Sequence, residues 1–149
     1  MENIRDAMIV RTATQEDFAK VIEIEELSFP TPWDHDFFEN ISKDIFLVFD
    51  GKEVCGYLIA GCCHKNISAT ILKVAVHPEH RRKGIATDLV HKLVEILKDR
   101  NIAEIDVIVM DACKPAILLY QKVGFKTVST IPQASSNDLH EMKLTIDEM

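Results

Sequence analysis

The stretch that decides the fold is residues 74–87, VAVHPEHRRKGIAT. β-Forming residues end at His77-Pro78, three basic side chains follow, and Gly84 precedes a segment with helical spacing of apolar residues. The sequence therefore predicts a strand, a cationic turn and a helix, in that order. The first N–H groups of a helix lack internal partners, and Gly84 permits a close approach or a positive φ. These features indicate a diphosphate site at the start of the helix.

Two common phosphate motifs do not describe this turn. No Lys-Ser or Lys-Thr follows a glycine, as a P-loop requires, and the three spaced glycines of a dinucleotide fingerprint are missing. The remaining alternative is a solvated turn whose three basic side chains bind nothing. An anion site is favoured somewhat over that alternative.

Upstream, the chain reads as an antiparallel meander. Strands are predicted over 45–49, 54–63 and 69–76, because β-branched and aromatic residues are frequent there. Asp50-Gly51 is a strong hairpin signal, and 64–66 is the next predicted turn.

The N-terminal part predicts a strand over 8–11 and then a helix. Thr14 is the expected N-cap, with Asp17 in a box-like arrangement. Pro30 and Pro32 must end this helix, and a short helix is expected over 34–42. The expected buried stripe is Phe18, Val21, Ile22 and Leu27.

Downstream, the helix that starts near Gly84 is expected to run to about Lys98, followed by a strand over 105–110. A second helix begins at Pro115 and ends at Gly124, and strands follow over 125–131 and 140–146. The buried face of the first helix is expected to be Leu89, Val90, Leu93, Val94 and Leu97. The result is an α/β (α+β) chain with helices packed on a mixed sheet.

Composition narrows the class of protein. The chain has 149 residues, 47% hydrophobic and 28% charged, which predicts one domain over 1–149. The net charge of −7 makes nucleic acid a poor partner and a basic protein or peptide a better one. No apolar run has the length of a membrane span or of a signal core, so a cytoplasmic location is expected. None of the four cysteines forms a CxxC pair, so buried free thiols are expected and neither a metal site nor a disulfide framework.

Two separated motifs carry a family resemblance. The pattern Arg81-x-x-Gly84-x-Ala86 resembles the pyrophosphate loop of GNAT acetyltransferases, and residues 116–125, AILLYQKVGF, resemble the AxxLYxxxGF signature of the same family. The two lie in the family's order, with a helix and a strand between them. Residues 29–33, FPTPW, look like the substrate loop of the RimI-like protein N-terminal acetyltransferases.

The resemblance implies the GNAT fold, which is a mixed, mostly antiparallel sheet of six to seven strands flanked by about four helices. It implies acetyl-CoA as co-substrate, no metal, and Tyr120 as general acid for the leaving thiolate, with packing on the sheet as the alternative. Phe29, Pro30 and Trp33 would contact the acceptor, with core packing as an equal alternative. The residues implied to bind acetyl-CoA are Val74, Val76, Arg81, Arg82, Lys83, Gly84, Ile85, Ala86 and Thr87.

Two positions depart from the RimI-like pattern. Ile108 stands where the strand usually carries a glutamate base, and Cys113 stands where an asparagine usually contacts the cofactor. Loss of the base suits an α-amine, because its pKa of about 8 leaves roughly a tenth of it neutral at pH 7. The other possible bases are His64, His77, His140 and Asp111, each with a surface role as the better alternative.

The resemblance therefore implies transfer of an acetyl group from acetyl-CoA to the N-terminal α-amine of a protein or peptide, by direct attack in a ternary complex. The implied protein is a cytoplasmic monomer or homodimer. Two alternatives stay open: a GNAT enzyme for a polyamine, amino acid or aminoglycoside, and an acyl-CoA-binding module without activity.

Overall fold

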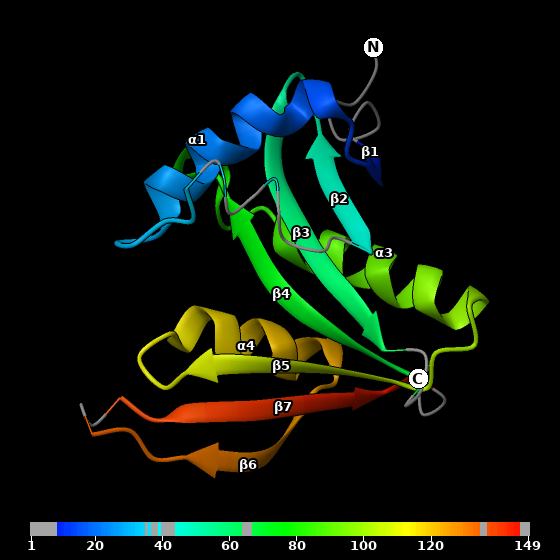
Figure 1. Cartoon of the computed structure of the whole chain (residues 1–149), viewed down its shortest axis with the longest axis vertical. Coiled ribbons are helices and arrows are strands. Elements are labelled where there is room, and N and C mark those ends of the chain that lie inside the picture. The colour runs from blue at the N-terminus through cyan, green and yellow to red at the C-terminus, as the bar shows by residue number, and fades with distance from the viewer. Residues whose placement is uncertain are drawn as a thin grey trace.

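The computed structural model describes residues 9–34, 36, 39, 44–63, 67–134 and 137–146. Within these residues the chain forms one seven-stranded sheet with the order β1-β2-β3-β4-β5-β7-β6 (Figure 1). The strands are β1 (Ile9–Thr12), β2 (Ile45–Asp50), β3 (Val54–Cys63), β4 (Ser68–Val76), β5 (Glu104–Met110), β6 (Lys126–Ile131) and β7 (Leu139–Thr145).

Three α-helices are described, together with two short 3-10 turns. They are α1 (Phe18–Ser28), α3 (Ile85–Asp99) and α4 (Lys114–Val123), with η2 (Gln15–Asp17) and η3 (Pro78–His80). The predicted mixed α/β sheet is confirmed, and its described elements lie within a residue or two of the predicted bounds. The helix expected over 34–42 and the turn over 64–66 fall largely or wholly outside the described residues.

The helices cover the two faces of the sheet unequally. Helix α1 packs on β3 and β4 on one face, whereas α3 and α4 pack against each other and the sheet on the opposite face. On the face that carries α1, no described helix covers strands β5, β7 and β6 (Figure 1). The predicted apolar positions of α3, Leu89, Val90, Leu93, Val94 and Leu97, are all buried.

Helix α1 differs from the prediction in its buried face. Leu27 is 52% exposed, whereas Val21, Ile24 and Glu25 are buried. These three residues have the i, i+3, i+4 spacing of one helical face, from which Leu27 points away. A buried carboxylate thus takes a place that the hydrophobic pattern assigns to a leucine.

Strands β4 and β5 form a fork. They pair in parallel only from Ser68 opposite Glu104 to Ile71 opposite Val107. Figure 1 shows the two strands diverging beyond that point. The opening leaves one edge of β4 without a neighbouring strand.

A bulge in β4 coincides with the start of the fork. On the β3 side, Ile59 pairs with Lys73 and Ala60 pairs with Ile71, so Leu72 is the extra residue. An extra residue bends its strand and increases the local twist. This distortion directs the rest of β4 away from β5.

The cysteine prediction is only partly correct. All four thiols are free, but only Cys55 is buried; Cys62 and Cys113 are half-buried and Cys63 is exposed. Cys63 ends β3 at the edge of the core, where its side chain reaches solvent. Within the described part of the chain, no helix has the length and apolar character that crossing a bilayer requires.

Candidate active site

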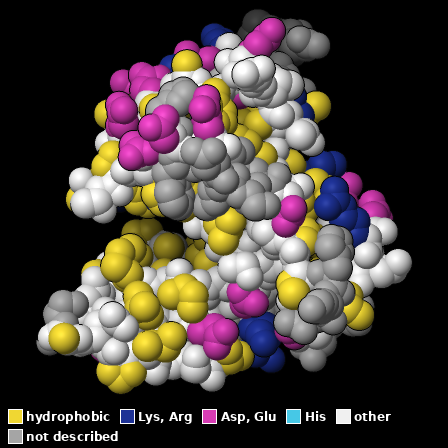
Figure 2. All heavy atoms as spheres, in the orientation of Figure 1, with side chains coloured by type: hydrophobic (Ala, Val, Ile, Leu, Met, Phe, Trp, Pro, Cys, Tyr) yellow, Lys and Arg dark blue, Asp and Glu magenta, His cyan; other side chains and the backbone are white. Residues whose placement is uncertain are grey.

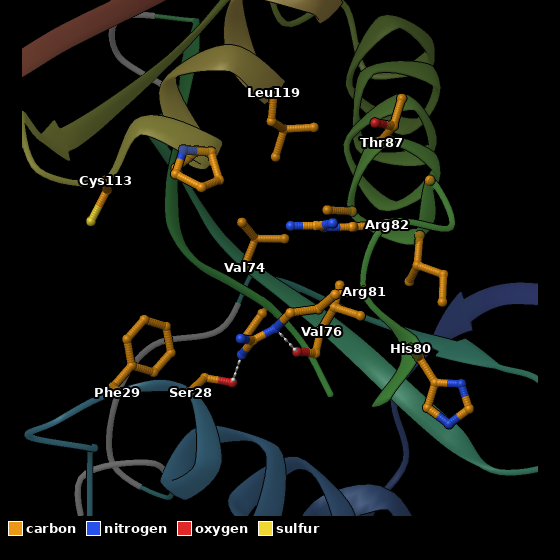
Figure 3. A pocket seen from close by; sticks show the side chains of 16 residues that line it. Ser28, Phe29, Val74, Val76, His80, Arg81, Arg82, Thr87, Cys113 and Leu119 are labelled. Carbon is orange, nitrogen blue, oxygen red and sulfur yellow. Dashed lines mark hydrogen bonds between the residues drawn. The ribbon is translucent and has the colours of Figure 1, made fainter. Parts of the chain in front are cut away.

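The fork opens into a cavity of about 650 Å³. Its walls come from the end of α1, from β4, from the turn before α3 and from the start of α4 (Figure 3). Eight of the nine predicted cofactor residues line it, all except Lys83, and so does Phe29. Three segments that are separate in the sequence, within 28–29, 74–87 and 113–119, therefore meet around one space, as the interpretation of the motifs requires.

The turn between β4 and α3 has the backbone of an anion cradle. Arg82 has φ of 66° and Gly84 has φ of 79°, so two residues of the turn are left-handed. When residues of a turn alternate between left-handed and other conformations, their successive N–H groups point to one side. These N–H groups then form a concave anion site. Arginine rarely adopts a positive φ, so the surrounding structure must hold Arg82 there.

The start of α3 adds further donors. The first i to i−4 backbone bond of α3 joins the Asp88 N–H to the Gly84 carbonyl at 3.0 Å. The N–H groups of Ile85, Ala86 and Thr87 therefore have no partner within the helix. The helix dipole gives this end a partial positive charge. The cradle and the helix end together suit a doubly charged diphosphate.

Close packing on β3 fixes where α3 begins. A Cβ on Gly56 would lie 3.0 Å from Ile85 Cγ2 and 3.3 Å from the Ala75 carbonyl oxygen. The missing side chain lets the first turn of the helix rest directly on the strand. The sequence analysis did not single out Gly56.

The three cationic side chains of the turn differ in their roles. Arg81 Nε donates to the Val76 carbonyl at 3.0 Å, and its Nη2 donates to Ser28 Oγ at 3.2 Å (Figure 3). Arg81 therefore joins β4 to the end of α1 across the mouth of the cavity. Arg82 and Lys83 have no hydrogen-bond or ion-pair partner among the described residues, which leaves both charges for a bound anion.

The backbone of β4 presents its unpaired edge to the cavity. The His77 N–H donates to the Cys55 carbonyl of β3 at 2.8 Å. Backbone groups of an antiparallel strand point alternately to the two sides, so those of Val74 and Val76 point to the fork. These are the two residues whose backbone the motif assigns to the pantetheine arm.

Tyr120 lies beneath the cavity rather than in its lining. Its side chain is 3% exposed and packs on Phe125 with 5.2 Å between ring centroids. Its helical neighbours Ala116 and Leu119 line the cavity. Burial raises the pKa of Tyr120, which keeps the phenol protonated at neutral pH. No described residue hydrogen-bonds to its hydroxyl, so a thiolate that approached it would meet a free donor.

The predicted acceptor loop divides into two parts. Phe29 lines the cavity, whereas Pro30 and Trp33 do not. The Lys73 ammonium instead lies over the Trp33 ring, and the backbone N–H of Trp33 donates to Glu25. Sequence reasoning missed Lys73 and Glu25, because only the fold brings positions 48 apart together.

The possible bases that the structure describes, His77, His140 and Asp111, have hydrogen-bond partners of their own. His64 lies outside the described residues. The His77 ring accepts from the Glu79 N–H at 3.1 Å. Both ring nitrogens of His140 have partners, Asp111 at 2.8 Å and Thr130 at 3.2 Å.

A carboxylate that the sequence analysis missed stands beside Ile108. Register places Glu141 of β7 directly opposite Ile108 of β5, on the open face of the sheet. Directly opposed side chains have Cβ atoms about 4.5–5.5 Å apart. Ile108 is the first residue of β5 beyond the last β4 pair, so Glu141 lies next to the vertex of the fork. The cross-strand register, and not the sequence spacing, reveals this neighbour.

Exposed apolar side chains gather on the open face at the far ends of β5 and β6. Ile108, Met110 and Ile131 are each more than 40% exposed and share this face by alternation and register. Figure 2 shows a hollow with hydrophobic side chains gathered along its lower side. An extended chain could lie along this surface with its end at the fork.

The arrangement defines an acyl-CoA-dependent transferase site, and comparisons with known proteins specify the family. The Acetyltransferase (GNAT) family matches residues 14–125, and the chain belongs to this family. An N-alpha-acetyltransferase of Saccharolobus solfataricus is 31% identical over 137 residues, 82% of each chain. A Bacillus subtilis protein named as a candidate ribosomal protein bS18-alanine N-acetyltransferase is 31% identical over 121 residues, 78% of this chain and 80% of its own.

Solved structures agree with the fold. The ribosomal-protein-S18-alanine N-acetyltransferase from Escherichia coli superimposes with a TM-score of 0.83 at 21% identity, covering 93% of this chain and 94% of its own. A candidate acetyltransferase from Salmonella typhimurium, solved with its cofactor acetyl-CoA, gives a TM-score of 0.79 at 23% identity and covers 96% of both chains. The chain is thus an acetyl-CoA-dependent N-acetyltransferase.

Proposed function

We propose that the chain acetylates the N-terminal α-amine of proteins or peptides. One observation carries the choice of acceptor: none of the sixteen residues that line the cavity is acidic, and two are arginines. A polyamine or an aminoglycoside needs carboxylates to bind its several cations. A peptide N-terminus brings one amine on a mostly uncharged backbone, which suits an open apolar surface.

The cofactor-binding residues fit the chemistry of acetyl-CoA. Arg82, Lys83 and the N–H groups of residues 84–87 would hold its diphosphate. The unpaired edge of β4 would hold its pantetheine arm as an added strand. The bound cofactor supplies an acetyl group activated as a thioester.

The chain's own residues would assist at two further points. A free N–H on the β4 edge can donate to the acyl oxygen, where negative charge grows during transfer. The Tyr120 hydroxyl can donate to the departing sulfur. Because burial raises the pKa of Tyr120, this hydroxyl acts more as a hydrogen-bond donor than as a source of a fully transferred proton.

Glu141 is the proposed acceptor of the amine proton. It lies opposite Ile108 at the vertex of the fork, and Ser129 Oγ donates to its Oε1 at 3.0 Å. A carboxylate here, one strand away from the usual position, restores a base where the motif lost one. The proton would move to it directly or through one water.

A peptide array with labelled acetyl-CoA tests the proposal. Each sequence is presented with a free and with a blocked α-amine, and spermidine and an aminoglycoside are assayed in parallel. We expect label on the free peptides alone, with rates that depend on the first residue. Acetylated spermidine or aminoglycoside without acetylated peptide would favour the small-amine enzyme instead.

A further inference from the structure

A buried charge cluster joins the end of α1 to β4 beside the cavity. Glu25 is fully buried in the last turns of α1. Its Oε2 accepts from Lys73 Nζ at 3.0 Å and from the backbone N–H of Trp33 at 2.8 Å. Its Oε1 accepts from the Tyr57 hydroxyl. The carboxylate therefore holds a strand residue and a residue of the loop at once.

The lysine of this cluster lies between two aromatic rings of the same loop. Lys73 Nζ is 3.9 Å from the centroid of Phe29 and 4.2 Å from the centroid of Trp33. An ammonium at this distance is attracted to both ring faces, and more strongly when shielded from water. The Lys73 side chain is only 13% exposed, so the shielding is present.

The cluster sets where Phe29 enters the cavity. Figure 3 shows Phe29 and Ser28 at the end of α1, facing the cavity and β4. The loop that follows contains Pro30 and Pro32, which have no N–H to donate to a regular backbone ladder. Among the described residues, the contacts of Phe29 and Trp33 with Lys73, and of Trp33 with Glu25, join this loop to β4.

Removal of one member would not simply release the other. A buried charge that loses its partner keeps the cost of its desolvation and draws in water or moves outward. Loss of Lys73 would thus free the two rings and leave the Glu25 carboxylate uncompensated beneath the loop. Phe29 would lose its fixed place in the cavity wall.

We propose that Glu25 and Lys73 are positioning residues that hold the Phe29–Trp33 loop in the place where it receives the acceptor. The inference rests on the proposed function for the identity of the acceptor, but not for the position of the loop. Lys73 neither takes a proton nor touches the acetyl group. It acts through the two rings that it holds.

The test compares Lys73→Met, Lys73→Arg and the double variant Glu25→Gln with Lys73→Met. Met keeps the length of the side chain without its charge, Arg keeps the charge, and the double variant removes both buried charges. Lys20→Met is the matched control, because Lys20 also pairs with carboxylates of Glu23 and Glu53 but lies away from the cavity.

Two readouts are measured on every variant. The first is the steady-state kinetics with a peptide acceptor that has a free α-amine, together with the Kd of acetyl-CoA from calorimetry. The second is acrylamide quenching of Trp33, which is the only tryptophan of the chain and so reports the loop directly. Chemical denaturation gives the stability of each variant.

For Lys73→Met we expect KM for the peptide to rise ~10-fold with kcat within ~3-fold, because a positioning contact has been lost and not a reacting group. Trp33 fluorescence should be quenched more readily in this variant, while its affinity for acetyl-CoA stays near the wild-type value. Lys73→Arg and Lys20→Met should keep wild-type values in both the kinetics and the quenching. The double variant should recover stability but keep the raised KM.

A different pattern overturns the inference. If the peptide KM returns to the wild-type value whenever stability recovers, the cluster serves only the fold. The same holds if quenching of Trp33 is unchanged in Lys73→Met. If the wild type acetylates no peptide but Trp33 quenching still increases in Lys73→Met, the proposed function is wrong. The inference that Glu25 and Lys73 hold the Phe29–Trp33 loop would remain.

Discussion

The two sides of the fork are built in different ways. The proposed cofactor wall, which is Val74, Val76 and the turn 81–87, presents mainly backbone: a strand edge, a left-handed turn and a helix end. The proposed acceptor wall, which is the Phe29–Trp33 loop beside Glu25 and Lys73, is positioned mainly by side chains. Backbone geometry serves one unchanging ligand, whereas side-chain contacts can change with the acceptor.

The difference also explains which changes each wall tolerates. A backbone cradle needs only a few residues with the right φ, so most of its side chains are free to vary. A side-chain clamp depends on every member, since each satisfies another's charge. Substitutions on the cofactor wall should therefore change binding of acetyl-CoA, and those on the acceptor wall should change binding of the peptide.

The largest effect is expected at Gly84. Its φ of 79° is left-handed, so a β-branched side chain would force the turn to another shape. We expect Gly84→Val to weaken acetyl-CoA binding by ~100-fold or more. Gly84→Ala should weaken it less, because a left-handed alanine costs only ~1–2 kcal/mol, which is ~5–30-fold in affinity. Calorimetry with acetyl-CoA measures both.

Gly61→Ala is the control for this pair. A Cβ at Gly61 would make only ordinary contacts, 3.8 Å to Asp44 Oδ2 and 3.9 Å to Leu72 Cδ1. It should bind acetyl-CoA like the wild type. Equal affinity for acetyl-CoA in the wild type and in Gly84→Val would mean that the diphosphate binds elsewhere. The assignment of the cofactor wall would then be wrong.

The next effect is expected at Glu141, which lies on β7 opposite Ile108, outside both walls. Glu141→Gln should lower kcat ~10–100-fold, less than the full contribution of a general base because part of the α-amine is already neutral. The Kd of acetyl-CoA should not change. The loss should shrink as pH rises, since a larger share of the amine then arrives without its proton.

A rescue variant sharpens this prediction. Ile108→Glu in the Glu141→Gln background returns a carboxylate to the same face, one strand across. Partial recovery of kcat at pH 7 is expected. A kcat for Glu141→Gln equal to that of the wild type over pH 6–9 would remove Glu141 from the mechanism.

The same contrast decides what could be predicted from the sequence. The strands, the helices and most of the cavity follow from periodicity and two local motifs, because a strand edge and a turn are made by neighbours in the chain. Glu25, Lys73 and Glu141 could not be found in that way. Apart from Trp33, which is eight residues from Glu25, their partners lie 32 to 48 residues away or on a neighbouring strand. Only the packing of α1 on β3 and β4 and the β5–β7 register bring them together.

The buried face of α1 shows the physical reason. A hydrophobic pattern assigns Glu25 to solvent, since an unpaired buried carboxylate is very costly. Three donors remove that cost, but the donors come from a loop and from two strands. A search for a charged residue at the i, i+4 position of an apolar stripe, here Glu25 after Val21, is the signal that could have indicated it.

A smaller effect is expected at Tyr120, whose ring is part of the core and whose hydroxyl is the proposed donor to the departing sulfur. Tyr120→Phe keeps the contact with Phe125 and removes only the donor. We expect kcat to fall ~10-fold, with acetyl-CoA affinity and stability nearly unchanged. Leu119→Met, a change in a cavity-lining neighbour without a donor, serves as the control. A wild-type kcat for Tyr120→Phe would leave the tyrosine with a packing role alone.

The smallest effect on catalysis, and a clear one on stability, is expected at the other end of α1. Arg11 donates two hydrogen bonds to Asp17, and with the Thr14 N–H these hold the pKa of Asp17 at about 2, below its usual value near 3.8. A lowered pKa means that Asp17 stabilises the fold above pH 4 and that this contribution is lost as pH falls from about 4 to 2.

Asp17→Asn should therefore be less stable at pH 7 by ~1–2 kcal/mol and approach the wild type near pH 2. Denaturant unfolding over this range measures the difference. Glu23→Gln is the control and should show a smaller dependence, because Lys20 also lowers the pKa of Glu23 but their ion pair is exposed to solvent. Because Asp17 anchors the helix that ends in the acceptor loop, Trp33 quenching should rise in acid before acetyl-CoA binding is lost. If the two change together, the walls do not move independently, and the contrast between them is only one of composition.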